Sequence, residues 1–509
     1  MRAPDEPASR ADQDVLEIGG RLAEPPSDRL IATAFADELR GQRDLFEAVS
    51  LADMAHTLMM MGAAGPIPRD KGAALLKALI ELHGRPEDFT LDPARGDLYT
   101  NREAWLNAHC AATGWLGVSR ARREPVTCGF HMTVRRRLLS LADALCAFTE
   151  ALSKTASRHR ATPFPDYTYL QAAQPTTLGH YLLGFAFPAE RHVERTLALF
   201  ARVNVSPAGG GSANGSIAPQ DRAALARMLG FDAPAANTRD AMWQADLSIE
   251  AAALVANILV TFDRLAEDLM VLATQEFGLV RLSDKHSRAS KIMPQKKNPF
   301  ALAYVRALAN QAIGLQATTA ASMRTPSGQM DNRMTAYSAI PSALRQAAEA
   351  AHLMAEVVRE LEVDEARAAA LLATGRLAAS DLAENVMLAT KLDFRTAHRV
   401  VGTLVRQLEA EERELATVTP ADLDRAAREA TGSPLVLDSD IIAQALDARR
   451  AVGARICIGG ASPHRVDEGV NALTAKTAEQ RRAIGKFAAN IGRALHDLMD
   501  KARAAAATA

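Results

Sequence analysis

The sequence SKIMPQKKNP, residues 290–299, decides how the rest of this chain is interpreted. It places a serine, an asparagine and several lysines close together, and it contains a Met-Pro pair and an Asn-Pro pair. A polar run of small residues from His286 to Ala289 predicts a loop, and the apolar pattern that starts at Phe300 predicts a long helix. A solvated loop that caps a helix would explain the Lys-Lys-Asn triplet alone. The alternative is a site for an acidic substrate, in which a hydroxyl lies beside fixed positive charge.

The composition argues against nucleic acid as a partner. The chain has 509 residues, of which 48% are hydrophobic, with 59 basic and 60 acidic side chains and a formal net charge of −1. This balance gives no electrostatic basis for binding a polyphosphate backbone. The three consecutive arginines at 135–137 are therefore expected on the solvated face of a helix.

The chain shows no sign of secretion, membrane insertion or metal binding. Its four cysteines lie far apart and lack the spacing of a disulfide framework or a zinc site, which suits a reducing compartment. The first 25 residues are polar and lack the apolar core of a signal peptide. The longest apolar stretch, Ala251 to Phe262, is shorter than the roughly 18 residues that a membrane span requires. We expect a soluble, cytoplasmic protein without a membrane partner or a metal.

The predicted fold class is all-α. Ala, Leu, Arg and Glu dominate, period-two runs are scarce, and long helical patterns cover about 130–158, 247–277, 300–323 and 342–361. Such helices predict a long central bundle. The pattern at 251–259 is apolar nearly all round, which requires more partners than one bundle provides and favours an oligomer. We divide the chain into a flexible segment (1–25), an N-terminal helical domain (26–125), the central bundle (126–374) and a C-terminal helical domain (375–509).

The 290–299 loop resembles the signature of the fumarase/aspartase superfamily, Gly-Ser-Ser-x-Met-Pro-x-Lys-x-Asn-Pro. Other segments resemble the argininosuccinate lyase branch in particular: 97–124, 168–175, 202–211, 378–398 and 458–466. The resemblance covers roughly residues 20–490. It implies a three-domain helical homotetramer whose central bundles form one multi-helix core. It also implies active sites assembled from three subunits each, with neither a metal nor an organic cofactor.

The resemblance assigns roles to several residues. Ser290 takes the place of the family's base serine, and Lys296 and Asn298 take the places of its carboxylate-binding pair. A serine is a poor base unless cations and N–H groups stabilise its alkoxide. Lys291, where the family has a second serine, could supply part of that stabilisation or could be an exposed loop lysine. Thr168 corresponds to a threonine that binds the substrate carboxylate, and Gln171 of the same stretch is expected at the substrate.

Two departures from the family's pattern bear on the chemistry. Tyr169 stands where the family has histidine, and Ala303 stands where it has the glutamate partner of that histidine. The phenol of Tyr169 could donate a proton to a leaving amine, or it could fill space and hydrogen-bond the substrate.

The substrate-binding positions depart as well. Arg122 is retained, whereas Arg123 replaces an asparagine and adds a second guanidinium that can bind a carboxylate. Gln329 and Met334 replace a tyrosine and a glutamine that grip the amino-acid end of argininosuccinate.

The resemblance therefore implies a carbon–nitrogen lyase that acts on a small dicarboxylate. We expect it to cleave an N-substituted aspartate reversibly to fumarate and an amine, through an aci-carboxylate intermediate. The alternatives are argininosuccinate lyase itself and a catalytically inactive structural homologue. The glycine-rich run 209–215 lacks the strand and the lysine of a nucleotide-binding loop, so we expect a tight turn near the substrate.

Overall fold

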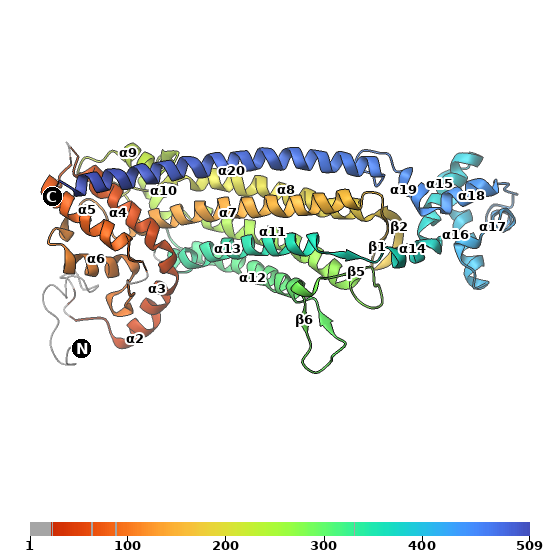
Figure 1. Cartoon of the computed structure of the whole chain (residues 1–509), viewed down its shortest axis with the longest axis horizontal. Coiled ribbons are helices and arrows are strands. Elements are labelled where there is room, and N and C mark those ends of the chain that lie inside the picture. Colours follow the sequence, from red (N-terminus) through yellow and green to blue (C-terminus); the bar gives the residue numbers. More distant parts are fainter. Residues whose placement is uncertain (1–21, 23, 63–64, 87–88, 330, 509) are drawn as a thin grey trace.

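Long helices run along most of the molecule, and a smaller group of helices lies at each end of them (Figure 1). The computed structural model describes residues 22, 24–62, 65–86, 89–329 and 331–508. Almost all of the predicted flexible segment, 1–25, lies outside these residues. The described strands form only two-stranded pairs, so the predicted all-α class is confirmed.

The N-terminal group consists of α2 to α6, which precede the first long helix. Their bounds are α2 Asp28–Leu30, a π-helical turn Ile31–Phe35, α3 Ala36–Gln42, α4 Phe46–Met60, α5 Arg69–His83 and α6 Leu98–His109. The long helices are α7 Arg123–Arg158, α8 Leu178–Val203, α11 Asp246–Leu272, α12 Phe300–Met323, α13 Asp331–Arg359 and α20 Pro463–Ala506. The short α9 Arg222–Met228 and α10 Thr238–Trp243 lie between α8 and α11 in the chain.

The group at the other end consists of α14 Glu365–Ala373, α15 Ala379–Thr390, α16 Phe394–Ala410, α17 Pro420–Thr431, α18 Ser439–Leu446 and α19 Ala448–Gly453. The strands are β1 Pro163–Thr168 with β2 Gln171–Thr177, β3 Val205–Ser206 with β4 Ala233–Pro234, β5 Val280–Arg281 with β8 Glu362–Val363, and β6 Arg288–Ala289 with β7 Lys297–Asn298.

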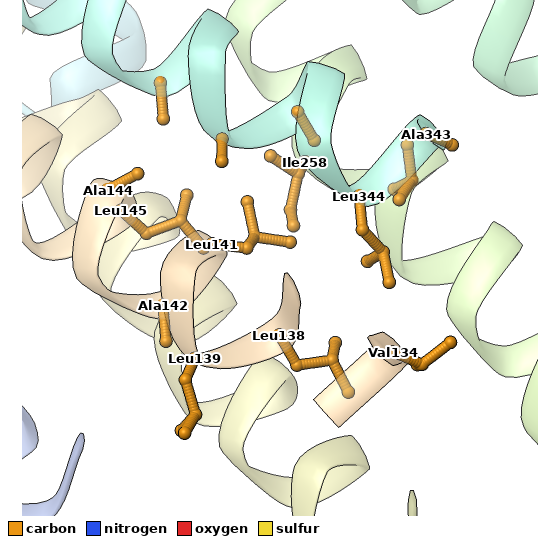
Figure 2. Close-up of a cluster of buried hydrophobic side chains, with 14 of the residues drawn as sticks. Val134, Leu138, Leu139, Leu141, Ala142, Ala144, Leu145, Ile258, Ala343 and Leu344 are labelled. Carbon is orange, nitrogen blue, oxygen red and sulfur yellow. The ribbon is translucent and has the colours of Figure 1, made fainter. Parts of the chain in front are cut away.

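Leucine side chains on one face of α7 form the centre of the bundle. Leu138, Leu141 and Leu145 recur at helical spacing, are fully buried, and pack with Ile258 of α11 and Leu344 of α13 (Figure 2). Burial of each such side chain stabilises the fold by about 1.5–3 kcal/mol. The stretch 251–259 of α11 is buried except at a few positions, as its all-round apolar pattern predicted.

Several helix boundaries differ from the predicted ones. Helix α12 spans the predicted 300–323, whereas α13 begins at Asp331, ahead of the predicted start near 342, and includes Pro341. A proline inside a helix costs about 3 kcal/mol. Ile340 and Leu344 are buried on either side of it, and this packing offsets the cost. The long helices α8 and α20 were not anticipated.

Helix α20 returns along the bundle from the far end. Its buried residues, including Leu473, Ile484 and Leu498, belong to the same apolar core as α7. A second core is built from residues between Leu382 and Ala445. The predicted 375–509 segment therefore contributes to two cores.

One surface expectation was wrong. Arg135, expected on a solvated face, is 1% exposed and donates hydrogen bonds to Asn204 and to the carbonyls of Leu229 and Gly230. All four cysteines are free thiols. Within the described ranges, every helix falls short of the continuous apolar length that crossing a bilayer takes.

Candidate active site

The 290–299 loop is a narrow hairpin closed by the pairing of β6 with β7 (Figure 1). Arg288 pairs with Asn298 and Ala289 with Lys297. The amide side chain of Asn298 donates to the Arg288 carbonyl at 2.9 Å, and the guanidinium of Arg288 lies 4.6 Å from the ring centre of Phe300. Helix α12 begins immediately after the hairpin, so its first turn fixes the base of the loop.

Ser290 is held in a turn of N–H donors. Its Oγ accepts hydrogen bonds from the backbone N–H groups of Met293 at 3.0 Å and Ile292 at 3.3 Å, and its own N–H donates to the Lys296 carbonyl at 3.3 Å. Such donors stabilise an oxyanion more than a neutral hydroxyl. This arrangement suits a serine that acts as a base, because its alkoxide needs that stabilisation.

The lysines of the loop differ in their surroundings. Lys297 donates to the Leu282 carbonyl at 2.5 Å and pairs with Asp284 at 2.6 Å, so it anchors the hairpin. Lys291 and Lys296 are exposed on the loop. Unlike Lys297, Lys296 forms no ion pair with any of the described residues. A lysine that binds a substrate carboxylate needs its charge to be available in this way.

The residues 168–171 form the tip of a second hairpin. Thr168 pairs with Gln171, and the two turn residues Tyr169 and Leu170 have φ of 55° and 58°. Positive φ at both central residues defines a type I′ turn, which favours Asn-Gly and costs roughly 1 kcal/mol for each residue with a bulky side chain. Tyr169 is 99% exposed. The turn therefore presents the Tyr169 ring away from the rest of its own chain.

The predicted substrate-binding arginines lie at the start of α7. Arg122 is the N-cap residue, and its Nε lies 3.9 Å from Asp97 Oδ2. Burial, followed by the neighbouring Arg123, lowers the pKa of Arg122. Gln329 lies in the turn before α13, where its N–H donates to the Pro326 carbonyl, and its side chain is exposed.

The structure does not bring these groups together within one chain. Arg123 opens α7, whose 36 residues span about 54 Å, and the hairpin with Thr168 follows its other end. In the same way, α12 has 24 residues and separates Ser290 from Gln329 by about 36 Å. A single site that contained all the predicted residues would have to combine opposite ends of different chains.

A buried charge network beside Arg122 was missed from the sequence. Asp53 is fully buried and contacts Arg102 Nη2 at 2.8 Å and Arg120 Nη1 at 3.1 Å. Arg120 lies 3.9 Å from Glu124, which accepts hydrogen bonds from the N–H groups of two residues of the 209–215 run. Burial lowers the pKa of Arg120, but Asp53 and Glu124 outweigh it and the pKa lies above its ordinary value.

This network fixes the backbone on both sides of the predicted arginines. The donors to Glu124 are Gly209 at 3.0 Å and Gly211 at 2.6 Å, both of which have a positive φ. The predicted tight turn is therefore confirmed, and it is anchored to the first turn of α7. The only signal in the sequence was the spacing of Arg120 and Glu124 by four residues.

Family models match two parts of the chain. One described as "Lyase" matches residues 31–314, and one described as "Argininosuccinate lyase C-terminal" matches residues 376–453. The argininosuccinate lyase of Methanoculleus marisnigri is 33% identical over 92% of this chain and 93% of its own length. That of Methanococcoides burtonii is 28% identical over 95% of this chain and 98% of its own.

Solved structures share the fold along nearly the whole chain. EDDS lyase in complex with formate is 25% identical, with a TM-score of 0.85, over 96% of this chain and 97% of that chain. A variant of EDDS lyase with bound fumarate gives the same values. The 3-carboxy-cis,cis-muconate lactonizing enzyme from Pseudomonas putida, with 21% identity and a TM-score of 0.67 over 89% of this chain and 98% of that chain, shares the fold.

Proposed function

This chain belongs to the argininosuccinate lyase branch of the fumarase/aspartase superfamily, and from that premise we propose that it cleaves an N-substituted aspartate to fumarate and an amine. The coarser activity, a carbon–nitrogen lyase that releases fumarate, is supported by the argininosuccinate lyases and by EDDS lyase. The observation that carries the finer proposal is the turn of N–H donors around Ser290 Oγ.

The hydroxyl proton of Ser290 is first lost to solvent, and the reaction then starts with the transfer of a substrate proton to the Ser290 alkoxide. The C–H bond next to a substrate carboxylate breaks, and its electron pair moves into that carboxylate to give a dianionic aci-carboxylate. Lys296 and Asn298 stabilise the added charge. The pair then returns to form the carbon–carbon double bond as the C–N bond breaks, and the amine leaves with the electron pair of that bond. The phenol of Tyr169 then gives the leaving nitrogen its proton; the alternative role for Tyr169 is to fill space and hydrogen-bond the substrate.

The site is proposed to form between subunits of a homotetramer. The 290–299 loop and the 168–171 turn are exposed, and so are large apolar side chains near them, among them Ile292 at 84% and Phe300 at 48%. Farther along α12, Tyr304 and Ile313 are 43% and 52% exposed. Apolar residues along a bundle helix favour packing against further copies of the bundle. Packing of this kind brings together, from different chains, the predicted site residues that lie at opposite ends of the helices within one chain.

The substrate is proposed to differ from argininosuccinate. Gln329 and Met334 replace the tyrosine and glutamine expected to grip an arginine moiety, and Arg123 adds a guanidinium. A site built to pair a polar group discriminates strongly against substrates that leave it unpaired. We expect better cleavage of an adduct whose amine carries an extra carboxylate, and a weaker preference in Arg123→Asn.

The test is a comparison of amines in the reverse direction. The protein is incubated with fumarate and a panel of amines, with and without an added carboxylate, and adducts are identified by mass spectrometry. We expect N-substituted aspartates to form, most readily with aminocarboxylates. Efficient release of arginine and fumarate from argininosuccinate, with kcat/KM above roughly 10⁴ M⁻¹s⁻¹, would instead establish argininosuccinate as the substrate.

A further inference from the structure

The N-terminal ends of α7 and α13 lie side by side. Tyr337 of α13 donates to Thr127 Oγ1 of α7 at 3.0 Å, and its ring stacks on Phe130 at 4.3 Å between ring centres. Both residues of α7 lie in its first turns, as Tyr337 does in α13, so the two helices start at the same end of the bundle (Figure 1). Helix N-termini carry partial positive charge, which favours an anion between them.

Arg333, in the first turn of α13, is buried, and its two terminal guanidinium nitrogens find no acceptor among the described residues. It is 6% exposed, and its guanidinium carbon lies 4.1 Å from the ring centre of Trp243 and 5.9 Å from that of Tyr337. Its Nη1 and Nη2 are buried and have no hydrogen-bond partner among the described residues. A buried guanidinium costs free energy unless an acceptor pairs with it. No pattern in the sequence singles out Arg333.

A small cavity adjoins this guanidinium. Its volume is about 20 Å³, and Arg333, His131 and Gln244 are among the residues that line it. The Oε1 of Gln244 and the Nε1 of Trp243 are also buried, and neither has a hydrogen-bond partner in the part of the chain that the structure describes. The cavity holds about one water-sized group, which is too small for a carboxylate, and Arg123 is not among the residues that line it.

Arg123 provides the more accessible charge at the same indole. Its guanidinium carbon lies 5.8 Å from the ring centre of Trp243, and the side chain is half-buried. Burial, followed by the charge of Arg333, lowers the pKa of Arg123. The two cations repel each other, and the charge of Arg333 adds to that of Arg123, so a carboxylate that contacts Arg123 is stabilised by both.

Acidic groups near the arginines do not neutralise them directly. The negative charges of Glu38 and Asp97 act to raise the pKa of Arg123. Among the residues described, however, neither carboxylate lies within ion-pair distance of Arg123 or Arg333. Burial raises the pKa of both carboxyl groups. His131, the histidine among the residues that line the cavity, is kept neutral because burial lowers its pKa to about 4. The side chains of residues 331 and 332 lie outside the described set.

We propose that Arg123 and Arg333, joined through Trp243, form a subsite for a carboxylate on the amine part of the substrate. Arg123 contacts the carboxylate, and Arg333 is a positioning residue that holds Trp243 and adds charge behind it. The inference rests on the proposed function and names the substrate class more narrowly, as the adduct of fumarate with an aminocarboxylate. In argininosuccinate the free end of the arginine moiety carries an α-ammonium group beside its carboxylate, and repulsion between this cation and the two guanidinium groups disfavours argininosuccinate.

The test compares carboxylate and amide isosteres. The substrates are aspartates whose nitrogen carries a carboxymethyl, carboxyethyl or carboxypropyl group, each paired with the matching primary amide, and fumarate release is followed by absorbance. We expect Arg333→Leu to lower the carboxylate-to-amide ratio of kcat/KM by roughly tenfold or more, since the positive charge behind Trp243 and the cation–π contact that holds its indole are both lost. The control is Arg345→Leu, which removes an exposed arginine from the same helix and should leave the ratio unchanged.

A binding readout separates this inference from the lyase proposal. If the wild type cleaves none of these adducts, the proposed substrate class fails, but the subsite is still tested by thermal stabilisation with glutarate against glutaramide. Selective stabilisation by glutarate that is lost in Arg333→Leu and kept in Arg345→Leu supports the subsite. An unchanged kcat/KM ratio, or equal stabilisation of Arg333→Leu and wild type by glutarate, overturns it.

Discussion

Replacement of Asp53 by asparagine should destabilise the protein far more than the loss of an equally short ion pair at the surface. Asp53 lies between Arg102 at 2.8 Å and Arg120 at 3.1 Å, and all three side chains are at most 2% exposed. Asparagine keeps the shape but removes the charge, which leaves two buried guanidinium groups with Glu124 as the remaining acid. Breaking a buried pair in this way costs about 3–5 kcal/mol.

The matched control is Glu47→Gln. Glu47 pairs with Arg136 at 2.7 Å, but the two side chains are 58% and 53% exposed, so the loss should be at most about 1 kcal/mol. Urea-induced unfolding followed by circular dichroism gives the free energy of unfolding of each variant. A cost for Asp53→Asn within about 1 kcal/mol of the control would refute the view that this network holds the start of α7 in place.

Further predictions concern the chemistry and the pH dependence. Ser290→Ala should lower kcat by about 10²- to 10⁴-fold with an unchanged circular dichroism spectrum, and activity within about tenfold of wild type would exclude its role as the base. Lys296→Met and Asn298→Ala should each lower kcat by about 10²-fold or more; a rise in KM alone would show that they bind only the ground state. Burial lowers the pKa of His131 to about 4, so the unfolded chain, with a pKa near 6.5, binds this proton more tightly. The free energy of unfolding should therefore fall as the pH drops from 6.5 towards 4, and an equally steep fall in His131→Gln would contradict this assignment.

The sequence predicted correctly those helices whose position and burial depend on residues that are close together in the chain. The Asn-Pro pair followed by the apolar repeat from Phe300 located α12 to the residue, and the all-round apolar stretch at 251–259 located a buried helix. The apolar pattern predicted this helix only from about 342, whereas α13 begins at Asp331 and contains Pro341. Packing on both sides of that proline, which the sequence does not display, overrides the local preference.

The arrangement of charged groups could not be predicted in the same way. Asp53, Arg102 and Arg120 meet only because α4, α6 and the start of α7 pack together, and their sequence separations carry no periodic signal. Arg333 and Trp243 come together through the neighbouring ends of α10 and α13. The roles of Ser290 and its neighbours came from the resemblance to a family, and the structure adds the hydrogen bonds that make such a role physically reasonable.

The central claim is that Ser290 acts in a site completed by the arginines of another chain. It is tested most directly by mixing two inactive variants, Ser290→Ala and Arg122→Ala, after reversible dissociation of the subunits. In an equal mixture, half of the chains carry an intact Ser290 and the other half carry an intact Arg122. A site that takes the two residues from different chains then has both intact in about one case out of four, so random reassembly should restore about a quarter of the wild-type activity. Each variant dissociated and reassembled alone should stay inactive. If the mixed sample also stays inactive while mass spectrometry shows that mixed oligomers have formed, Ser290 and Arg122 do not act from different chains and the account is contradicted.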